Sequence, residues 1–103
     1  MFAEAVSASD GSILVGELAK YMTQHGVQIG QNRLFENLRA DGFLCSAKGE
    51  RWNLPTQRAM EMGLFELKKN LIMTPEGPKD VKPTTKVTGR GQIYFLNRYA
   101  TAV

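Results

Sequence analysis

The sequence predicts a small α+β domain of winged-helix-like type, in which a helix-turn-helix is followed by a β-hairpin wing, a short helix, a second β-hairpin and a C-terminal helix. Three observations predict this fold. The 103-residue length fits one domain with one core. Apolar residues recur at helical spacing twice near the start and again at the end. Between these regions, after Gly42, the apolar period changes to that of a β-strand.

Residues 1–11 contain few large side chains and end in Ser-Ala-Ser-Asp-Gly, so they are predicted to be a linker or arm ahead of a domain at 12–103. The first helix follows from an apolar stripe at positions i, i+3, i+4 and i+7: Val15, Leu18, Ala19 and Met22. Gly26 suits the end of this helix. The second helix, from about Gly30 to Ala40, places Leu34, Phe35 and Leu38 inward, and Gly42 ends it. Two short helices with this connection have helix-turn-helix spacing.

The wing is predicted from Phe43 and Cys45, which alternate before a polar loop at 46–50, and from Trp52 and Leu54 on the return. Lys48 and Arg51 would lie at or near its tip, and Phe43 and Trp52 would form the core beneath it. The alternative is that Trp52 is exposed and acts as an anchor in an interface. A short helix then opens at Pro55-Thr56 and runs to Met62.

The second hairpin is predicted from strand residues between Phe65 and Met73, a turn-rich loop at 74–80 and a return strand from Pro83 to Val87. Thr88 is the expected N-cap of the last helix. That helix has two apolar stripes: Ile93, Leu96, Ala100 and Val103, and then Phe95, Tyr99 and Ala102. One stripe should close the core. Phe95 and Tyr99, on the other, are candidates for a homodimer interface, and the alternative is that the second hairpin covers them.

The composition, 43% hydrophobic and 22% charged, is that of an ordinary soluble domain. Neither a membrane-length apolar run nor a secretory signal pattern occurs, which favours a cytoplasmic location. With one cysteine and one histidine, the chain offers neither an internal disulfide nor a structural zinc site. The sequence therefore predicts a protein that is not an enzyme and needs no cofactor or metal.

The formal net charge is +3, and the basic surplus gathers after residue 80. Lys86 and Arg90 are expected to be accessible there and to help capture a partner, because Gly89-Arg90-Gly91 opens a helix whose N–H groups favour anions. The alternative is that Thr88 caps this helix and the glycines permit a tight turn.

On the second helix, Asn32, Arg33 and Asn37 are candidates to read base edges in a DNA major groove. However, Glu36 lies in the middle of the same outward face and would repel phosphates, and the helix is neutral overall. A solvated or protein-contacting face is therefore the preferred interpretation over DNA reading.

Three separated motifs carry a family resemblance: Asn-Arg-Leu-Phe at 32–35 with Leu38-Arg39, Glu-Arg-Trp-Asn-Leu-Pro-Thr-Gln at 50–57, and Thr-Thr-Lys-Val-Thr-Gly-Arg-Gly-Gln at 84–92. In this order they resemble the C-terminal domain of phage antirepressors, the KilA-C domain, over about residues 12–99. The resemblance implies a module that binds and inactivates a prophage repressor in the bacterial cytoplasm and so favours lytic growth. It also implies an upstream domain before Met1. The alternative function is sequence-specific DNA binding in phage transcription regulation.

Overall fold

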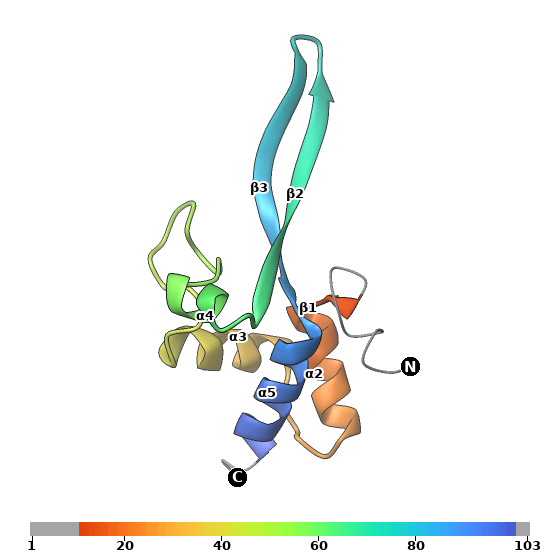
Figure 1. Cartoon of the computed structure of the whole chain (residues 1–103), viewed down its shortest axis with the longest axis vertical. Helices are drawn as coiled ribbons and strands as arrows, with labels where there is room; N and C mark the ends of the chain where they lie inside the picture. The colour runs from red at the N-terminus through yellow and green to blue at the C-terminus, as the bar shows by residue number, and fades with distance from the viewer. Residues whose placement is uncertain (1–10, 101–103) are drawn as a thin grey trace.

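The computed structural model describes residues 11–100 as an α+β domain (Figure 1). Residues 1–10, most of the predicted linker, and 101–103 lie outside the described part. The elements in chain order are β1 (Ile13–Leu14), α2 (Val15–Gln24), α3 (Gln31–Ala40), α4 (Gln57–Glu61), β2 (Phe65–Thr74), β3 (Gly77–Val87) and α5 (Gly89–Ala100). The three strands form an antiparallel sheet in the order β1-β3-β2. The predicted α+β class is confirmed.

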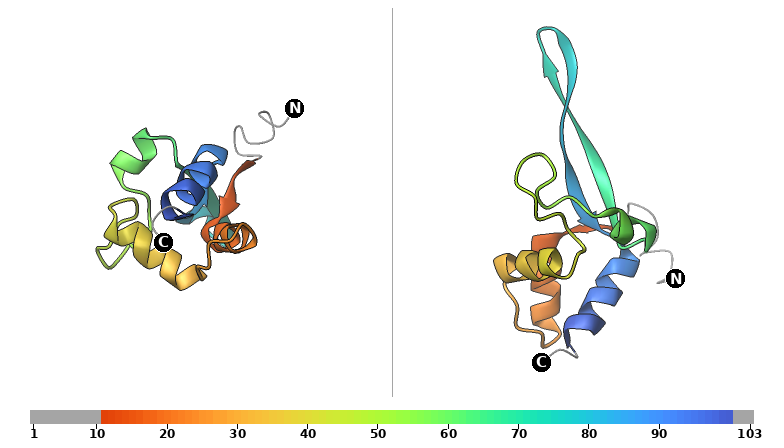
Figure 2. Two further views of the ribbon diagram at one scale, coloured as in Figure 1. Left: turned by 90° about the horizontal axis from the view of Figure 1, so that it is seen from below. Right: turned by 90° about the vertical axis from the view of Figure 1, so that its left-hand side faces the viewer.

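Helices α2 and α3 form where the apolar spacing predicts them. Leu18 and Met22 of α2 and Leu34 and Leu38 of α3 are fully buried, whereas Phe35 is only half-buried. The chain leaves both helices through left-handed glycines, a conformation in which a Cβ would be strained: φ is +91° at Gly26 and +84° at Gly42. Figure 2 shows α2, α3 and α5 gathered on the side of the domain away from the projecting hairpin.

The first predicted hairpin is present only as an antiparallel return of the chain, without the predicted strands: the Thr56 N–H donates to Phe43 O and the Asn53 N–H to Cys45 O, both at 3.0 Å. Leu44 and Pro55 form an isolated bridge, and the N–H of Cys45 donates to Leu54 O at 2.8 Å, but residues 45–55 form a loop without strands. The physical reason is that Asn53 adopts a left-handed φ of +64°, which interrupts the extended backbone that a return strand requires. We call residues 45–55 the Trp52 loop.

The second predicted hairpin is present and longer than expected. Strands β2 and β3 pair from Phe65↔Val87 to Thr74↔Gly77, leaving a turn of only Pro75 and Glu76. The hairpin, which we call the arm (residues 65–87), projects away from the helices (Figure 1). A register shift after Lys68 bends it. There the Asn70 Nδ2 donates to Lys82 O (3.0 Å) and to Thr84 Oγ1 (2.9 Å). These bonds give hydrogen-bond partners to two oxygen atoms of β3 where the regular ladder is interrupted.

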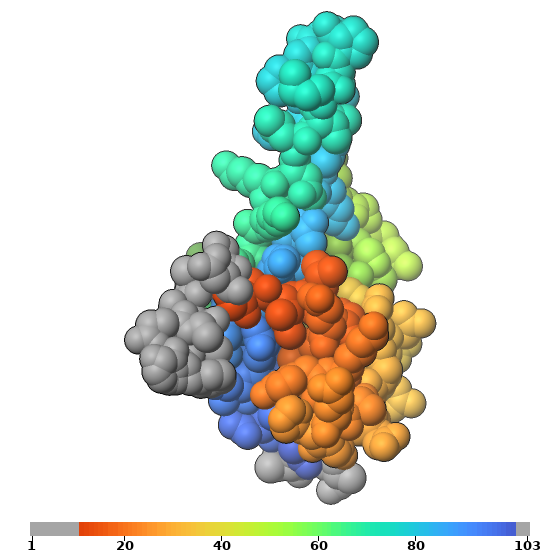
Figure 3. Space-filling view, turned by 90° about the vertical axis from the view of Figure 1, so that its right-hand side faces the viewer, coloured from red at the N-terminus to blue at the C-terminus, as the bar shows by residue number. Residues whose placement is uncertain are grey.

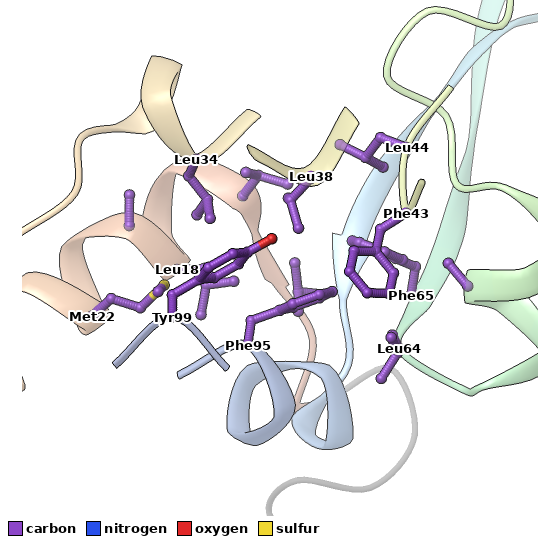
Figure 4. Packing of buried hydrophobic residues seen from close by; sticks show 14 of the residues in the cluster. Leu18, Met22, Leu34, Leu38, Phe43, Leu44, Leu64, Phe65, Phe95 and Tyr99 are labelled. Atoms are coloured by element: carbon purple, nitrogen blue, oxygen red, sulfur yellow. The ribbon is translucent and has the colours of Figure 1, made fainter. Parts of the chain in front are cut away.

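The core centres on Phe95 of α5 (Figure 4). Its ring lies 5.1 Å from Phe43, 5.5 Å from Phe65 and 6.2 Å from Tyr99, measured between centroids. Phe95 is 0% and Tyr99 9% exposed, while Ile93 on the other stripe is 50% exposed. The aromatic stripe therefore closes the core, and the prediction that Phe95 and Tyr99 face outward toward a second copy is wrong. The helix turns these residues inward because Phe43 and Phe65 supply aromatic partners.

The start of α5 packs unusually close to the chain before β2. Thr88 caps the helix as predicted: its Oγ1 accepts from the Gly91 N–H at 3.0 Å and donates to Gly63 O at 2.6 Å. Gly91 is buried, and a Cβ there would overlap the Leu64 carbonyl and come within 2.9 Å of Val87 Cγ1. The cap agrees with the alternative to the anion-binding prediction, and the structure adds a packing role for Gly91 that the sequence did not indicate.

Candidate interaction surface

Trp52 contacts two cations on the surface of the domain. The guanidinium carbon of Arg39 lies 4.2 Å from its ring centroid and the Lys48 Nζ lies 4.5 Å away. The side chain is half-buried and does not belong to the core cluster. The prediction that Trp52 forms core beneath a hairpin is therefore wrong, because the Trp52 loop forms no sheet that could bury it.

Polar contacts fix the Trp52 loop between α3 and the arm. Arg39 Nη1 donates to Asn53 Oδ1 at 2.7 Å, so one arginine both stacks on Trp52 and anchors the next residue. From β3, the Lys82 Nζ donates to Trp52 O (2.7 Å) and the Thr85 Oγ1 donates to Asn53 O (3.0 Å). These bonds hold Asn53 at a left-handed φ of +64°. Trp52 is thus pre-oriented, which lowers the entropy lost when a partner binds.

Two open hollows flank the indole. One, of about 430 Å³, lies between the start of α2, α3, the Trp52 loop and β3, and is lined in part by Gln31, Phe35, Trp52 and Lys82. The other lies along α3 and includes Asn32, Phe35, Arg39 and Trp52. We define the Trp52 surface as six residues taken from the lining of the second hollow and from the Lys48 contact: Gln31, Asn32, Phe35, Arg39, Lys48 and Trp52. Glu36 also lines the second hollow. The Trp52 surface combines two partly accessible aromatic rings with cations.

The structure places several predicted site residues on or beside this surface. Asn32 and Arg33 are exposed at the start of α3, and Asn32 lines the second hollow. Lys48 stacks on Trp52, and Arg51 lines a further hollow against residues 80–83 of the arm. Asn37 is half-buried. Sequence reasoning missed Gln31, Phe35 and Arg39 and considered Trp52 only as the alternative to a core role. The incomplete inward turn of Phe35 has no sequence signal.

Lys86 and Arg90 lie elsewhere. Lys86 is half-buried and pairs across the strands with Glu66, in a hollow with Leu67 and Lys68. Arg90 is exposed, as predicted, and its side chain passes beside Gly63. The structure therefore does not join these two residues to the α3 candidates in one site.

A hydrogen-bonded carboxylate ties α5 to the end of α3. The Tyr99 hydroxyl donates to Asp41 Oδ2 at 2.9 Å, and Arg98 Nε lies 3.4 Å from the same oxygen. Burial, followed by the hydrogen bond to Asp41, raises the pKa of Tyr99 well above its ordinary value of 10.0.

Replacing Tyr99 with Phe is expected to lower the free energy of unfolding by about 1–2 kcal/mol at neutral pH, because the hydrogen bond from the Tyr99 hydroxyl to the Asp41 carboxylate is lost. The raised pKa also sets a pH dependence. The protonated phenol stabilises the folded state fully below the unfolded pKa of 10.0, and this contribution is lost as the pH rises above it. Urea unfolding from about pH 9 to about pH 11 should show a steeper loss in the unchanged chain than in Tyr99→Phe. Parallel curves would contradict this role.

Among residues 11–100, no cluster of three or more His, Cys, Asp or Glu side chains is arranged to hold a metal ion. No helix in that range is long and apolar enough to cross a membrane. The fold and site define a small α+β domain with a projecting two-stranded arm and a surface tryptophan, Trp52.

Comparison with known proteins gives the family. The family model described as the phage antirepressor protein KilAC domain matches residues 1–102, and the chain belongs to this family. Over 101 residues, 98% of the chain, it is 40% identical to the protein kilA of Escherichia phage P1. The match spans 35% of the P1 protein, so the chain corresponds to about a third of that relative's length. No solved structure matches the chain. The predicted family resemblance is confirmed.

Proposed function

We propose that this KilAC domain binds a prophage repressor through the Trp52 surface and prevents it from occupying its operator. The observation that carries the proposal is the half-buried Trp52, contacted by Arg39 and Lys48 and flanked by two hollows. Tryptophan and arginine are enriched among the residues that dominate binding energy at protein interfaces. The rigid loop presents the indole with little rotamer freedom left to lose.

The charge on α3 favours a protein partner over DNA. Glu36 is exposed among the outward residues, and the Arg39 guanidinium is already engaged by Asn53 and Trp52. Only Arg33 remains as an exposed cation on that helix. DNA affinity comes mainly from neutralised phosphates, and this helix offers few such contacts.

DNA binding is the second candidate function. We infer a winged-helix-like arrangement in which α2 and α3 form the helix pair and the arm takes the place of the wing. Asn32 and Arg33 are exposed at the start of α3, where a recognition helix contacts bases, and Lys68, Lys69 and Lys79 are exposed along the arm. These cations favour at least non-specific binding at low salt.

The test is an operator-release assay. Fluorescently labelled operator DNA, bound by the repressor of the phage that encodes this chain, should be released when the chain is added in stoichiometric amount. The chain alone should bind the same DNA only weakly and lose it as salt rises. Trp52→Ala should weaken release by at least about 30-fold, which is the factor for losing about 2 kcal/mol at an interface hot spot.

Met60→Ala is the matched control, because Met60 is a 39% exposed hydrophobic residue on α4 that does not line the Trp52 hollows. It should leave release unchanged, and circular dichroism should show both variants folded. Sequence-selective binding of the chain alone to DNA, at about 10⁻⁸ M and physiological salt, would instead favour the second function.

A further inference from the structure

The outer part of the arm carries apolar side chains that the described domain does not cover. Leu71, Ile72 and Met73 of β2 are 62%, 47% and 78% exposed. A two-stranded hairpin alone is only marginally stable in water. Figure 3 shows the arm standing clear of the helical body. A partner that covered these side chains would bury apolar surface and stabilise the arm.

The two edges of the arm differ. Within residues 11–100, β2 pairs with β3 alone, so its outer edge is unpaired, and most of its residues from Leu67 to the turn are exposed. The edge of β3 is obstructed: β1 pairs with its end at Lys86 and Val87, and the Trp52 loop lies against residues 80–83. Pro78 and Pro83 further remove two N–H donors from β3. Only β2 offers a continuous edge for another strand.

The register shows which β2 groups point outward. Pro78 has no N–H and lies opposite Met73, so this pair does not exchange hydrogen bonds. Hydrogen-bonded and non-bonded pairs alternate along an antiparallel ladder, so Leu71↔Asp80 is also a non-bonded pair. The main-chain groups of Leu71 and Met73 therefore face away from β3, available to a new strand.

We propose that two copies of this chain associate by antiparallel pairing of their β2 edges, centred on Ile72, to form a four-stranded sheet. The outward main-chain N–H and C=O of Leu71 in one copy then form hydrogen bonds with those of Met73 in the other. By symmetry, Met73 of the first copy bonds in the same way with Leu71 of the second. Their side chains share a face, and the two Ile72 side chains meet on the opposite face. Each two-fold-related contact occurs twice, as symmetric dimers require.

The charges on β2 and its turn favour a second copy of the chain as the partner, and they favour this register. Lys68 and Lys69 lie toward the base of β2, and Glu76 lies at the turn. Antiparallel pairing centred on Ile72 brings Lys68 beside the turn that carries Glu76 of the second copy, and by symmetry this happens twice. A register centred closer to the base of β2 would place Lys68 and Lys69 of one copy opposite the same lysines of the other. Like charges directly opposite each other are destabilising. Lysines on an open edge disfavour non-specific strand pairing. Here they still permit pairing with a second copy in this register.

Sedimentation equilibrium of the purified chain tests the proposal. The expected result is a concentration-dependent mass approaching twice the 11.5 kDa of one chain. Leu71→Pro should give a monomer, because it removes an outward N–H without touching the bonds to β3. Glu76→Lys and Lys68→Glu should each weaken dimerisation by about tenfold, since two exposed pairs become repulsive. The double swap should restore it.

Two matched controls locate the interface. Lys79→Glu reverses an arm charge that lies on β3, and Ile93→Ser removes an exposed apolar residue on α5. Both should dimerise like the unchanged chain. A single-chain mass at concentrations up to about 1 mM, the weak end of specific association, would overturn the proposal. So would a dimer unaffected by Leu71→Pro and by both charge reversals. None of these outcomes depends on repressor binding.

Discussion

Replacing Gly91 with Ala is expected to destabilise the domain by at least about 2 kcal/mol, although Ala is the better helix former. The added Cβ would overlap the carbonyl oxygen of Leu64, a main-chain atom that cannot rotate away as a side chain can. The helix must therefore move off the chain preceding β2, which would pull Phe95 away from Phe43 and Phe65. Thermal unfolding should show a midpoint lowered by about 10 °C.

Gly30→Ala provides the control for this substitution. Gly30 precedes α3 with an ordinary φ of −85°, and a Cβ there meets nothing within 4 Å. Gly30 is the N-cap of α3, so the change should cost only the cap preference of glycine over alanine, about 1 kcal/mol. Equal midpoints for Gly91→Ala and the unchanged chain would mean that α5 does not pack against Leu64 as the structure has it.

Truncating Phe95 to Ala is expected to cost about 3–5 kcal/mol of stability, the usual range for a buried phenylalanine. Phe95 is 0% exposed and its ring meets Phe43, Phe65 and Tyr99. Domains of this kind have only about 5–15 kcal/mol of stability in total, so the variant should be partly unfolded at 37 °C. Urea denaturation followed by circular dichroism measures the loss.

Ile93→Ala, on the same helix but 50% exposed, should change stability by less than about 1 kcal/mol. The pair of variants tests which stripe of α5 closes the core. A stable Phe95→Ala variant that instead dissociates a dimer would restore the interface role that the sequence predicts for Phe95, and would contradict the packing in Figure 4.

The helices could be predicted from sequence because their apolar spacing and their terminal glycines agree. Leu18 and Met22, or Leu34 and Leu38, lie on one face whatever the tertiary partner is. The Trp52 loop could not be predicted in this way. Its residues alternate in type as a strand would, yet the long-range bonds from Lys82 and Thr85, some 30 residues later in the chain, decide its conformation.

The candidate site was predictable only in part. Asn32 and Lys48 follow from their polar types and their positions near the helix start and the loop. The stacking of Arg39 on Trp52 joins residues 13 positions apart through the fold of the loop, and local periodicity does not contain it. Similarly, the apolar spacing of α5 does not predict which of its two stripes faces the core. The rings of Phe43 and Phe65, contributed by distant segments, decide that.

Trp52 is the only tryptophan in the chain, which allows one direct test of the proposed repressor contact. Chain labelled with 5-fluorotryptophan gives a single ¹⁹F resonance that reports on Trp52 alone. Adding the unlabelled repressor should shift or broaden this resonance to saturation at a stoichiometric ratio, and operator DNA without repressor should leave it unchanged at physiological salt. A resonance that moves with DNA alone and not with the repressor would contradict the proposed function.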